Sequence, residues 1–287
     1  MTGMMDPQAP QRDRHLVVLT DLDGTLLDQR TCSFSAANEA LNELQRHKVP
    51  IVLCSRRTRI EIELIQLDLH LRHPFISENG SALFIPRNYF PFGVRDARSA
   101  GGCDVIEFGI PCGRLVESLR RVAGELSAAV VITREMQAEP GTGHCQCDSR
   151  RGGWVEPHEY DVPFRLPDSI PQQKNRLFSA LRAAGLNCAR GNGCYRVTGV
   201  TDRGQAVKRL SSLCERAWGD VLTVGLGDSS DDLPLLLRVD IPFVVRNLAL
   251  GISNQLCCLV PKARMSSAPG PQGWNEMMLE VLAQYMN

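Results

Sequence analysis

The sequence contains short runs of apolar residues, each followed at once by acidic, hydroxyl or amide side chains. Short runs without a polar face are typical of strands that are buried on both sides of a parallel sheet. Apolar residues at helical spacing separate the first three runs, within residues 36–44 and 60–67. This alternation predicts an α/β fold whose core is a doubly wound, Rossmann-like parallel sheet. The predicted strands are residues 16–20, 51–53, 74–76, 221–224 and 242–245.

The middle of the chain has a different character, because it is rich in glycine and proline over residues 86–102 and 140–171. Its remaining pattern predicts strands at 104–108 and 129–132, helices at 115–126 and 175–184, and a hairpin around 191–193. We interpret it as an inserted α+β domain. The predicted organisation is a disordered leader at 1–14, a catalytic core of 15–84 and 200–287, and an inserted cap of 85–199.

Composition excludes several classes of partner. The chain has 32 basic and 32 acidic residues, so it lacks the excess of positive charge with which proteins bind nucleic acid. No window reaches the roughly 18 apolar residues that a membrane-spanning helix needs. The N-terminal residues have no apolar signal segment, and the eleven cysteines are scattered, so we expect a cytoplasmic protein with reduced thiols. No obligate protein partner is evident.

The string Asp-Leu-Asp-Gly-Thr-Leu-Leu-Asp at residues 21–28 carries the strongest chemical signal. Asp21 and Asp23 directly follow a buried strand and are two residues apart, and Gly24 allows the chain to turn sharply. One carboxylate can attack phosphorus as a nucleophile, and the other can deliver and recover a proton. This pattern predicts phosphoryl chemistry at the end of the first strand.

A second acidic string, Gly-Leu-Gly-Asp-Ser-Ser-Asp-Asp at residues 225–232, follows another buried strand. Adjacent strands would bring Asp228 against Asp21, where converging carboxylates repel each other unless a cation is present. Carboxylate oxygens suit Mg²⁺, so we predict a magnesium site. The same residues also favour the start of a helix at 233–237. The predicted metal ligands are Asp21, Asp23, Asp228 and Asp232.

Weaker signals lie between these strings. Ser55 ends the second predicted strand, where a hydroxyl and backbone N–H groups can hold a phosphate oxygen. Arg203 opens a predicted helix and can neutralise both phosphate and carboxylates. Taken alone, Ser55 is also typical of a helix cap or a turn, and Arg203 is also typical of a solvated surface charge. The predicted residues for phosphate and substrate binding are Ser55, Arg57, Glu78, Asn79 and Arg203.

In order and spacing, these segments resemble the haloacid-dehalogenase superfamily of phosphatases over nearly the whole core. The resemblance implies that Asp21 is the nucleophile, Asp23 the general acid and base, Ser55 a phosphate-binding hydroxyl and Asp228 a magnesium ligand. Arg203 stands where the superfamily normally has lysine, and Asp231 where it often has asparagine. The large insertion resembles the α+β cap of the Cof-type branch.

Within that branch, the strings at residues 50–58, 75–80, 227–234 and 270–275 look most like the mannosyl-3-phosphoglycerate phosphatase family. One string departs from that family. It usually has Gly-Gly-Arg, two aromatic residues and His ahead of the Arg203 segment, whereas this chain has Gly-Asn-Gly-Cys-Tyr-Arg at residues 191–196. This string lies in the cap, which selects the substrate, so the leaving group stays open. Candidate cap contacts are Arg151, Trp154, Glu156 and Arg196.

The resemblance implies a Mg²⁺-dependent phosphatase acting on a small phosphorylated sugar acid. The expected substrate is mannosyl-3-phosphoglycerate or its glucosyl analogue, hydrolysed through an aspartyl-phosphate. A broader Cof-type sugar phosphatase and a phosphomannomutase-like phosphotransferase remain alternatives. A degenerate sugar-phosphate-binding regulator is a third, but the presence of both Asp21 and Asp23 argues against it, because a binding protein needs no general acid.

Overall fold

The computed structural model describes residues 14–132, 158–167, 171–190, 194–249 and 251–286. Residues 1–13 of the predicted leader lie outside this range. Arg14 is described, and its guanidinium pairs with Asp220 at 3.1 Å, next to the start of the first strand.

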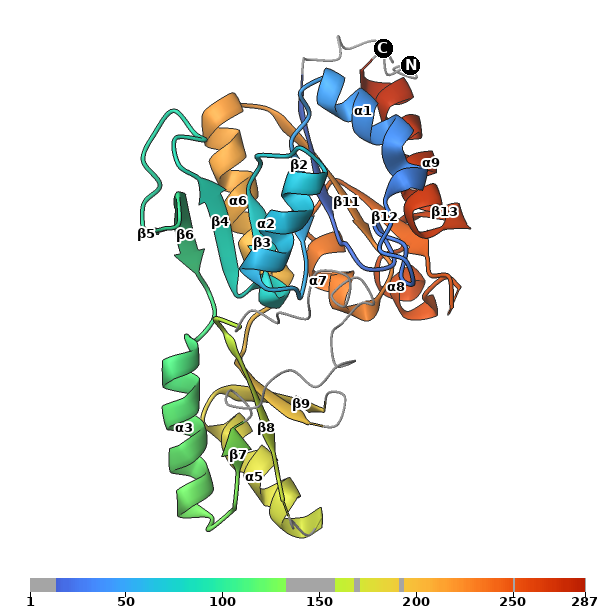
Figure 1. Ribbon diagram of the computed structural model, residues 1–287. Coiled ribbons are helices and arrows are strands. Elements are labelled where there is room, and N and C mark those ends of the chain that lie inside the picture. The colour runs from blue at the N-terminus through green and yellow to red at the C-terminus, as the bar shows by residue number, and fades with distance from the viewer. Residues whose placement is uncertain (1–13, 133–157, 168–170, 191–193, 250, 287) are drawn as a thin grey trace, which may run out of the picture.

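Nine strands form one large sheet in the order β13-β12-β11-β1-β2-β3-β4-β6-β5 (Figure 1). Every pair from β13 to β3 is parallel, which confirms the predicted doubly wound α/β core. The pairs from β3 to β5 are antiparallel. The strands are β1 (His15–Thr20), β2 (Ile51–Cys54), β3 (Phe75–Ser77), β4 (Ala82–Pro86), β5 (Arg98–Ala100), β6 (Cys103–Glu107), β11 (Val221–Gly227), β12 (Ile241–Arg246) and β13 (Arg264–Pro269).

Helices cover both faces of this sheet. On one face, α1 (Asn38–Arg46), α2 (Arg59–Asp68) and α9 (Gly270–Tyr285) contribute to one hydrophobic cluster. On the other, α6 (Arg203–Trp218), α7 (Leu233–Leu236) and α8 (Asn254–Leu259) contribute to a second. The 3₁₀ turns are η1 (Ser35–Ala37), η2 (Glu78–Gly80) and η4 (Ser230–Asp232). The central strands β1, β2, β3 and β11 are therefore buried along almost their whole length, which explains their continuous apolar runs.

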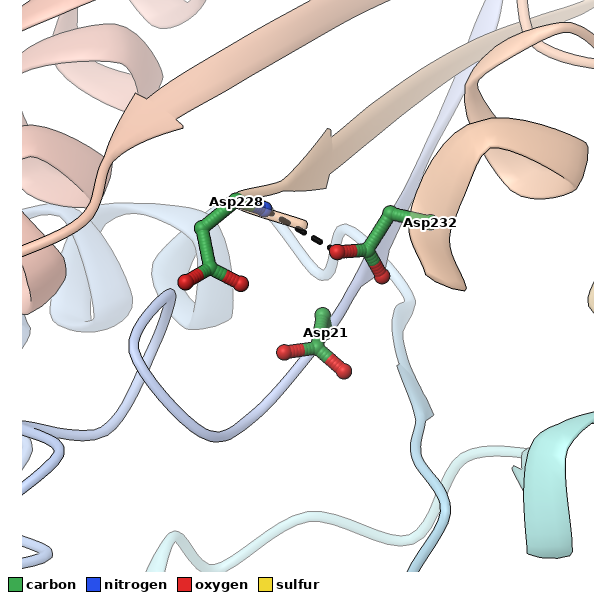
Figure 2. Close-up of side chains that lie close together, drawn as sticks. All are labelled: Asp21, Asp228 and Asp232. Atoms are coloured by element: carbon green, nitrogen blue, oxygen red, sulfur yellow. Dashed lines mark hydrogen bonds between the residues drawn. The ribbon is translucent and has the colours of Figure 1, made fainter. Parts of the chain in front are cut away.

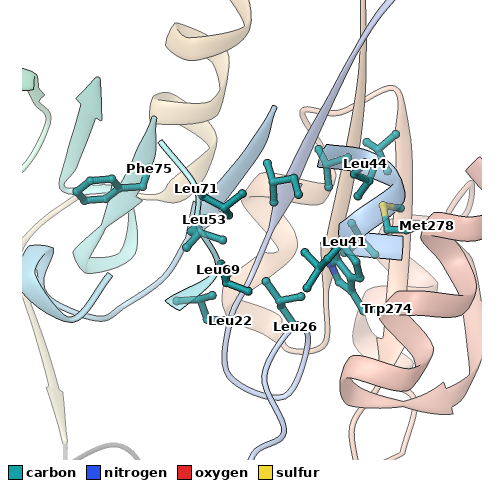
Figure 3. Packing of buried hydrophobic residues seen from close by; sticks show 14 of the residues in the cluster. Leu22, Leu26, Leu41, Leu44, Leu53, Leu69, Leu71, Phe75, Trp274 and Met278 are labelled. Carbon is teal, nitrogen blue, oxygen red and sulfur yellow. The ribbon is translucent and has the colours of Figure 1, made fainter. Parts of the chain in front are cut away.

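Trp274 at the start of α9 is a main packing element of the first cluster (Figure 3). Its side chain is fully buried, and its indole N–H donates to the Thr20 hydroxyl at 3.0 Å. The Thr20 hydroxyl in turn donates to the backbone carbonyl of Asp21 at 2.8 Å. The string at residues 270–275 thus begins a helix that supports the end of β1.

A second sheet, in the order β7-β8-β10-β9, is antiparallel and forms the cap. Two helices contribute to a third hydrophobic cluster with one face of this sheet, which confirms an inserted α+β unit (Figure 1). The predicted hairpin is the pair β9 and β10. The cap elements are α3 (Cys112–Glu125), β7 (Val131–Ile132), β8 (Asp161–Arg165), α5 (Pro171–Ala183), β9 (Leu186–Arg190) and β10 (Tyr195–Gly199).

The predicted insertion of residues 85–199 does not lie in the cap as one piece. Strands β5 and β6 extend the large sheet through β4, so residues 98–107 belong to that sheet. Backbone pairing places them there, because β6 pairs with β4 over five residue pairs, from Ala82 with Glu107 to Pro86 with Cys103. The chain passes to the cap between Glu107 and Cys112 and returns between Gly199 and Arg203.

Eight cysteines in the described part of the chain are free thiols. Cys32 is disulfide-bonded, so the expectation of reduced thiols does not hold there. A disulfide depends on a close approach of two Cα atoms, which sequence spacing alone does not reveal. Within the described residues, no helix is long and apolar enough to cross a membrane.

We expect Trp274→Phe to lower the free energy of unfolding by about 1–3 kcal/mol, because it removes a buried hydrogen bond and leaves a cavity. Trp274→Ala should cost about 3–5 kcal/mol. Urea unfolding followed by circular dichroism measures both changes. The matched control is Trp218→Phe, which alters a half-buried tryptophan on the opposite face of the sheet. Equal effects of the two Phe variants would contradict a special role of Trp274.

Candidate active site

The two acidic strings, at residues 21–28 and 225–232, meet because the strands before them are neighbours in the sheet. Strand β1 pairs in parallel with β11, with Thr20 opposite Leu226, so both strands end at the same edge of the sheet. The Asp21 N–H continues this pairing by donating to the Leu226 carbonyl at 3.0 Å. Asp21 and Asp228 therefore lie side by side, as expected from the sequence (Figure 2).

Asp21, Asp228 and Asp232 form a buried carboxylate cluster, with one oxygen of each within 4.8 Å of the others. Their exposed fractions are 6%, 5% and 0%. Asp232 also caps the turn η4, since its Oδ2 accepts from the N–H groups of Asp228 and Ser229, both at 3.0 Å. The capping role of this acidic string thus coexists with its place in the cluster.

Arg203 supplies the positive charge within this cluster. It is the first residue of α6, is 3% exposed, and donates from Nη1 to Asp21 Oδ1 at 2.8 Å. The same nitrogen contacts Asp232 Oδ1, and Nε donates to Asn79 Oδ1 at 3.0 Å. The guanidinium therefore uses its fork to join three partners from different segments, which a lysine ammonium on a single stem does not reproduce.

The charges of the cluster do not balance. Three carboxylates face one guanidinium, and burial with repulsion from Asp232 raises the pKa of Asp21 well above its ordinary value. Burial and the same neighbour raise the pKa of Asp228 to about 6. An additional cation would relieve this repulsion, and three buried carboxylates are the hard oxygen donors that Mg²⁺ prefers. The residues of the cluster therefore fit a divalent metal ion.

Asn247, which directly follows β12 and is buried, is not among the site residues predicted from the sequence. Its side-chain N–H₂ donates to Asp228 Oδ2, and the Thr25 hydroxyl donates to Asp228 Oδ1 at 3.5 Å. Together they orient the Asp228 carboxylate. The signal was present in the sequence, since Asn247 is a polar residue that follows one of the predicted strands, as the other site residues do.

Asp23, predicted as a metal ligand, has its carboxylate outside the cluster and bound to Arg57. Arg57 donates from Nε to Asp23 Oδ2 at 3.0 Å and from Nη2 to Asp23 Oδ1 at 2.6 Å. Arg57, predicted to bind phosphate, is 2% exposed and holds this carboxylate in a bidentate pair. Ser55 is fully buried at the end of β2, and its hydroxyl accepts from the Arg57 N–H at 3.2 Å.

The neighbours Glu78 and Asn79 were both predicted to bind substrate or phosphate, but they point to different partners. Asn79 holds Arg203, whereas the buried Glu78 carboxylate accepts hydrogen bonds from the backbone of Glu159 and Tyr160, beside the cap. The reason lies in the backbone, because both residues have positive φ, at 44° and 59°, and the chain turns sharply between them.

Among the predicted cap contacts, Arg151, Trp154 and Glu156 lie outside the described residues. Arg196 lies on β10, where its Nε donates to Asp161 Oδ2 at 2.6 Å. Asp231 is exposed, so its charge does not enter the buried cluster.

A profile of the haloacid dehalogenase-like hydrolases matches residues 18–89, which include Asp21, Asp23 and Ser55. A glucosyl-3-phosphoglycerate/mannosyl-3-phosphoglycerate phosphatase of Methanococcoides burtonii is 32% identical over 94% of this chain and 98% of its own length. The chain belongs to this phosphatase family. A mannosyl-3-phosphoglycerate phosphatase of Pyrococcus furiosus is 31% identical, over 81% of this chain and 91% of its own.

A phosphatase of the same superfamily from Bacteroides thetaiotaomicron has a similar fold, with a TM-score of 0.61 at 17% identity. The similarity covers 98% of this chain and 99% of that structure, so the core and the cap are both included. The chain is therefore a phosphatase of haloacid dehalogenase type, and its carboxylate cluster lies where parallel α/β sheets bind their ligands.

We expect Mg²⁺ to raise the melting temperature of this phosphatase, because the ion binds the folded cluster only. At one hundred times its dissociation constant, Mg²⁺ stabilises the fold by about 2.7 kcal/mol. The effect should be larger at pH 7.5 than at pH 5. Below the raised pKa of Asp228, about 6, a proton occupies that carboxylate in the metal-free fold and competes with the ion.

Thermal unfolding with and without Mg²⁺ at both pH values measures this difference. Asp228→Asn should abolish the stabilisation. The matched control is Asp231→Asn, which removes an exposed carboxylate three residues away and should retain the full effect. An equal shift in all three proteins would mean that Mg²⁺ binds elsewhere.

Proposed function

We propose that this chain is a Mg²⁺-dependent phosphatase that hydrolyses a glycosyl-3-phosphoglycerate, mannosyl or glucosyl, to glycosylglycerate and phosphate. The observation that carries the proposal is the Asp21 carboxylate, held at a strand end by Arg203 within a cluster of three buried acids. Relatives named for this reaction match the chain over nearly its whole length, with the cap included, which supports the same substrate class.

Asp21 acts as the nucleophile. Its carboxylate oxygen forms a bond to phosphorus while the bond from phosphorus to the glycerate oxygen breaks, which gives an aspartyl-phosphate. Arg203 binds Asp21 Oδ1 at 2.8 Å, so it fixes the orientation of the carboxylate and places positive charge beside the transferring phosphoryl group. Burial of both side chains strengthens this interaction.

Asp23 acts as the general acid and then as the general base. It gives a proton to the departing glycerate oxygen and later takes one from the water that hydrolyses the aspartyl-phosphate. The Arg57 fork holds both oxygens of Asp23 at 2.6 and 3.0 Å, so Arg57 positions this group rather than the phosphate. The Ser55 hydroxyl, at the end of the next strand, contributes a phosphate contact.

Asp21, Asp228 and Asp232 would hold the magnesium ion, with Asn247 and Thr25 orienting Asp228. When bound, Mg²⁺ supplies positive charge to the oxygens of the phosphoryl group. Without the ion, Arg203 alone would face the negative charges of the three carboxylates and of the phosphate dianion.

A substrate panel tests the proposal. Phosphate release is measured with mannosyl- and glucosyl-3-phosphoglycerate, 3-phosphoglycerate and simple hexose phosphates, with Mg²⁺ and with EDTA. We expect the glycosyl-3-phosphoglycerates to have the highest kcat/KM, EDTA to abolish turnover and Mg²⁺ to restore it. Asp21→Asn should be inactive yet folded, because an amide cannot form the acyl-phosphate. A hexose phosphate as the best substrate would refute the substrate class, and an active Asp21→Asn would refute the nucleophile.

Arg203 should contribute to catalysis by electrostatic stabilisation. We expect Arg203→Ala to lower kcat/KM by about 2 kcal/mol, roughly 30-fold, in line with the removal of one stabilising group at a reacting centre. Arg203→Lys loses the fork that reaches Asn79 but keeps the charge, and we expect it to retain or raise the activity, because a compact ammonium can reach the same oxygen.

Steady-state kinetics at saturating Mg²⁺ measures both variants. Lys208→Ala, which alters an exposed residue of the same helix, is the matched control and should behave as the wild type. An Arg203→Ala variant with unchanged kcat/KM would show that the phosphoryl group needs no charge from this side chain.

A further inference from the structure

The turn η2, Glu78–Gly80, has an unusual backbone. All three of its residues have positive φ, at 44°, 59° and 93°, and two of them are not glycine. Left-handed conformations of this kind are unfavourable for residues with a side chain, and they persist only where the surroundings fix them. Here the Glu78 N–H donates to the Arg57 carbonyl at 3.1 Å, and the Asn79 N–H donates to the Ser55 carbonyl at 3.0 Å.

This backbone sends two adjacent side chains to different parts of the molecule. Asn79 accepts from Arg203 Nε at 3.0 Å, inside the carboxylate cluster. Glu78 accepts from the Glu159 N–H through Oε1 at 2.8 Å and from the Tyr160 N–H through Oε2 at 3.0 Å. Residues 159 and 160 lead directly into the cap strand β8. One turn therefore contacts both the catalytic cation and the cap.

The contacts of Glu78 continue along the cap. Its Oε2 lies 3.2 Å from His158 Nδ1, and Arg196 Nη2 lies 2.6 Å from His158 Nε2. Arg196 on β10 is opposite Pro163 on β8, and its Nε donates to Asp161. In the cap sheet, Val162, Phe164 and Val197 face the hydrophobic cluster formed with α3 and α5. Asp161, Pro163 and Arg196 alternate with them and therefore lie on the opposite face of the sheet, which α3 and α5 do not cover.

Residues 158–160 are also held by the large sheet and by α3. The Tyr160 hydroxyl donates to Glu107 at 2.6 Å, and Arg98 donates to that hydroxyl at 3.2 Å, both from strands of the large sheet. The Cys112 N–H, at the start of α3, donates to the Glu159 carbonyl at 2.8 Å. Residues 158–160 are thus a third connection between sheet and cap, beside the two chain crossings.

Burial of Glu78 has an energetic cost that these contacts offset. Its side chain is 3% exposed, and a buried carboxylate is costly unless several donors reach it. Two backbone N–H groups and one imidazole do so, and neither Gln nor a nonpolar residue can accept all three bonds. A nonpolar side chain would bury the same surface area with a smaller desolvation penalty. The carboxylate instead supplies hydrogen bonds of defined direction to residues 158–160.

We propose that Glu78 is a positioning residue that fixes the orientation of the cap, and with it His158 and Arg196, over the catalytic cluster. Glu78 does not itself touch the substrate in this proposal. The proposal predicts that loss of Glu78 affects two kinds of substrate differently. A substrate with a sugar that reaches the cap requires this orientation, whereas a small phosphomonoester that reaches only Asp21 does not. The choice of large substrate rests on the proposed function.

The experiment compares Glu78→Gln with Glu107→Gln in the full-length protein. Both variants remove one carboxylate charge that binds residues 158–160, but a glutamine at position 107 can still accept from the Tyr160 hydroxyl. Kinetics is measured with mannosyl-3-phosphoglycerate and with para-nitrophenyl phosphate, whose leaving group has no sugar. We expect Glu78→Gln to raise KM for the sugar substrate at least tenfold and to change kcat/KM for para-nitrophenyl phosphate less than threefold. Glu107→Gln should change neither more than threefold.

Hydrogen exchange gives a readout that needs no substrate. The N–H groups of Glu159 and Tyr160 should exchange at least tenfold faster in Glu78→Gln than in the wild type, while amides in the centre of β11 keep their protection. Equal losses with both substrates, or unchanged exchange at residues 159 and 160, would overturn the proposal and leave Glu78 a general structural residue.

Failure of the proposed function is separable from failure of this inference. If the wild type hydrolyses no glycosyl-3-phosphoglycerate, the proposed substrate is wrong, and the kinetic comparison uses the best sugar phosphate of the panel instead. The exchange measurement is unaffected in that case. A tenfold higher KM for the sugar substrate with little change for para-nitrophenyl phosphate, together with faster exchange at residues 159 and 160, supports the role of Glu78. Absence of either result refutes it.

Discussion

The structure is organised around the repulsion among three buried carboxylates that face one guanidinium. Asp21, Asp228 and Asp232 lie within reach of one another, and burial raises the pKa of Asp21 and Asp228, so the cluster is costly in the absence of an added positive charge. The donors around it limit that cost without cancelling it, as when Ser229 and the Asp228 N–H bind Asp232. A site that is destabilised when empty gains most from binding a cation, and the added positive charge can then also offset the charge of a phosphoryl group.

The register of the large sheet makes this cluster possible. Strand β1 lies between β11 and β2, so side chains from residues 21, 55 and 228 meet at one edge although they are far apart in the sequence. The approach is so close that two glycines are required. A Cβ on Gly24, which has φ of 89°, would lie 2.6 Å from Asp228 Oδ2, and a Cβ on Gly227 would lie 2.4 Å from Asp232 Cβ. The glycines of both acidic strings are therefore steric requirements of the cluster.

Sequence analysis predicted the parts of the site that depend on strand ends, since an apolar run and the polar residue after it are visible in the sequence. It predicted that Asp21, Asp228 and Arg203 lie together, and the structure brings their side chains into one cluster; the same rule extends to Asn247. It did not predict which way a side chain leaves the backbone. The positive φ of Glu78 turns its carboxylate toward the cap, and the fork of Arg57 takes both oxygens of Asp23. Nor did it find the edge of the insertion, because β5 and β6 join the large sheet through backbone hydrogen bonds that the sequence pattern does not specify.

Two arginines from different parts of the chain connect to the same turn, Glu78–Gly80. Arg203 binds Asn79 directly, and Arg196 reaches Glu78 through His158. A lysine has no second nitrogen with which to hold Asn79 and Asp21 together, so the link from the catalytic cluster to the turn depends on the fork of Arg203. The turn Glu78–Gly80 then links that cation to the cap. The contacts of the cap and those of the catalytic cation therefore converge on one set of three residues, which is why positions 196 and 203 belong to a single connected set of side chains.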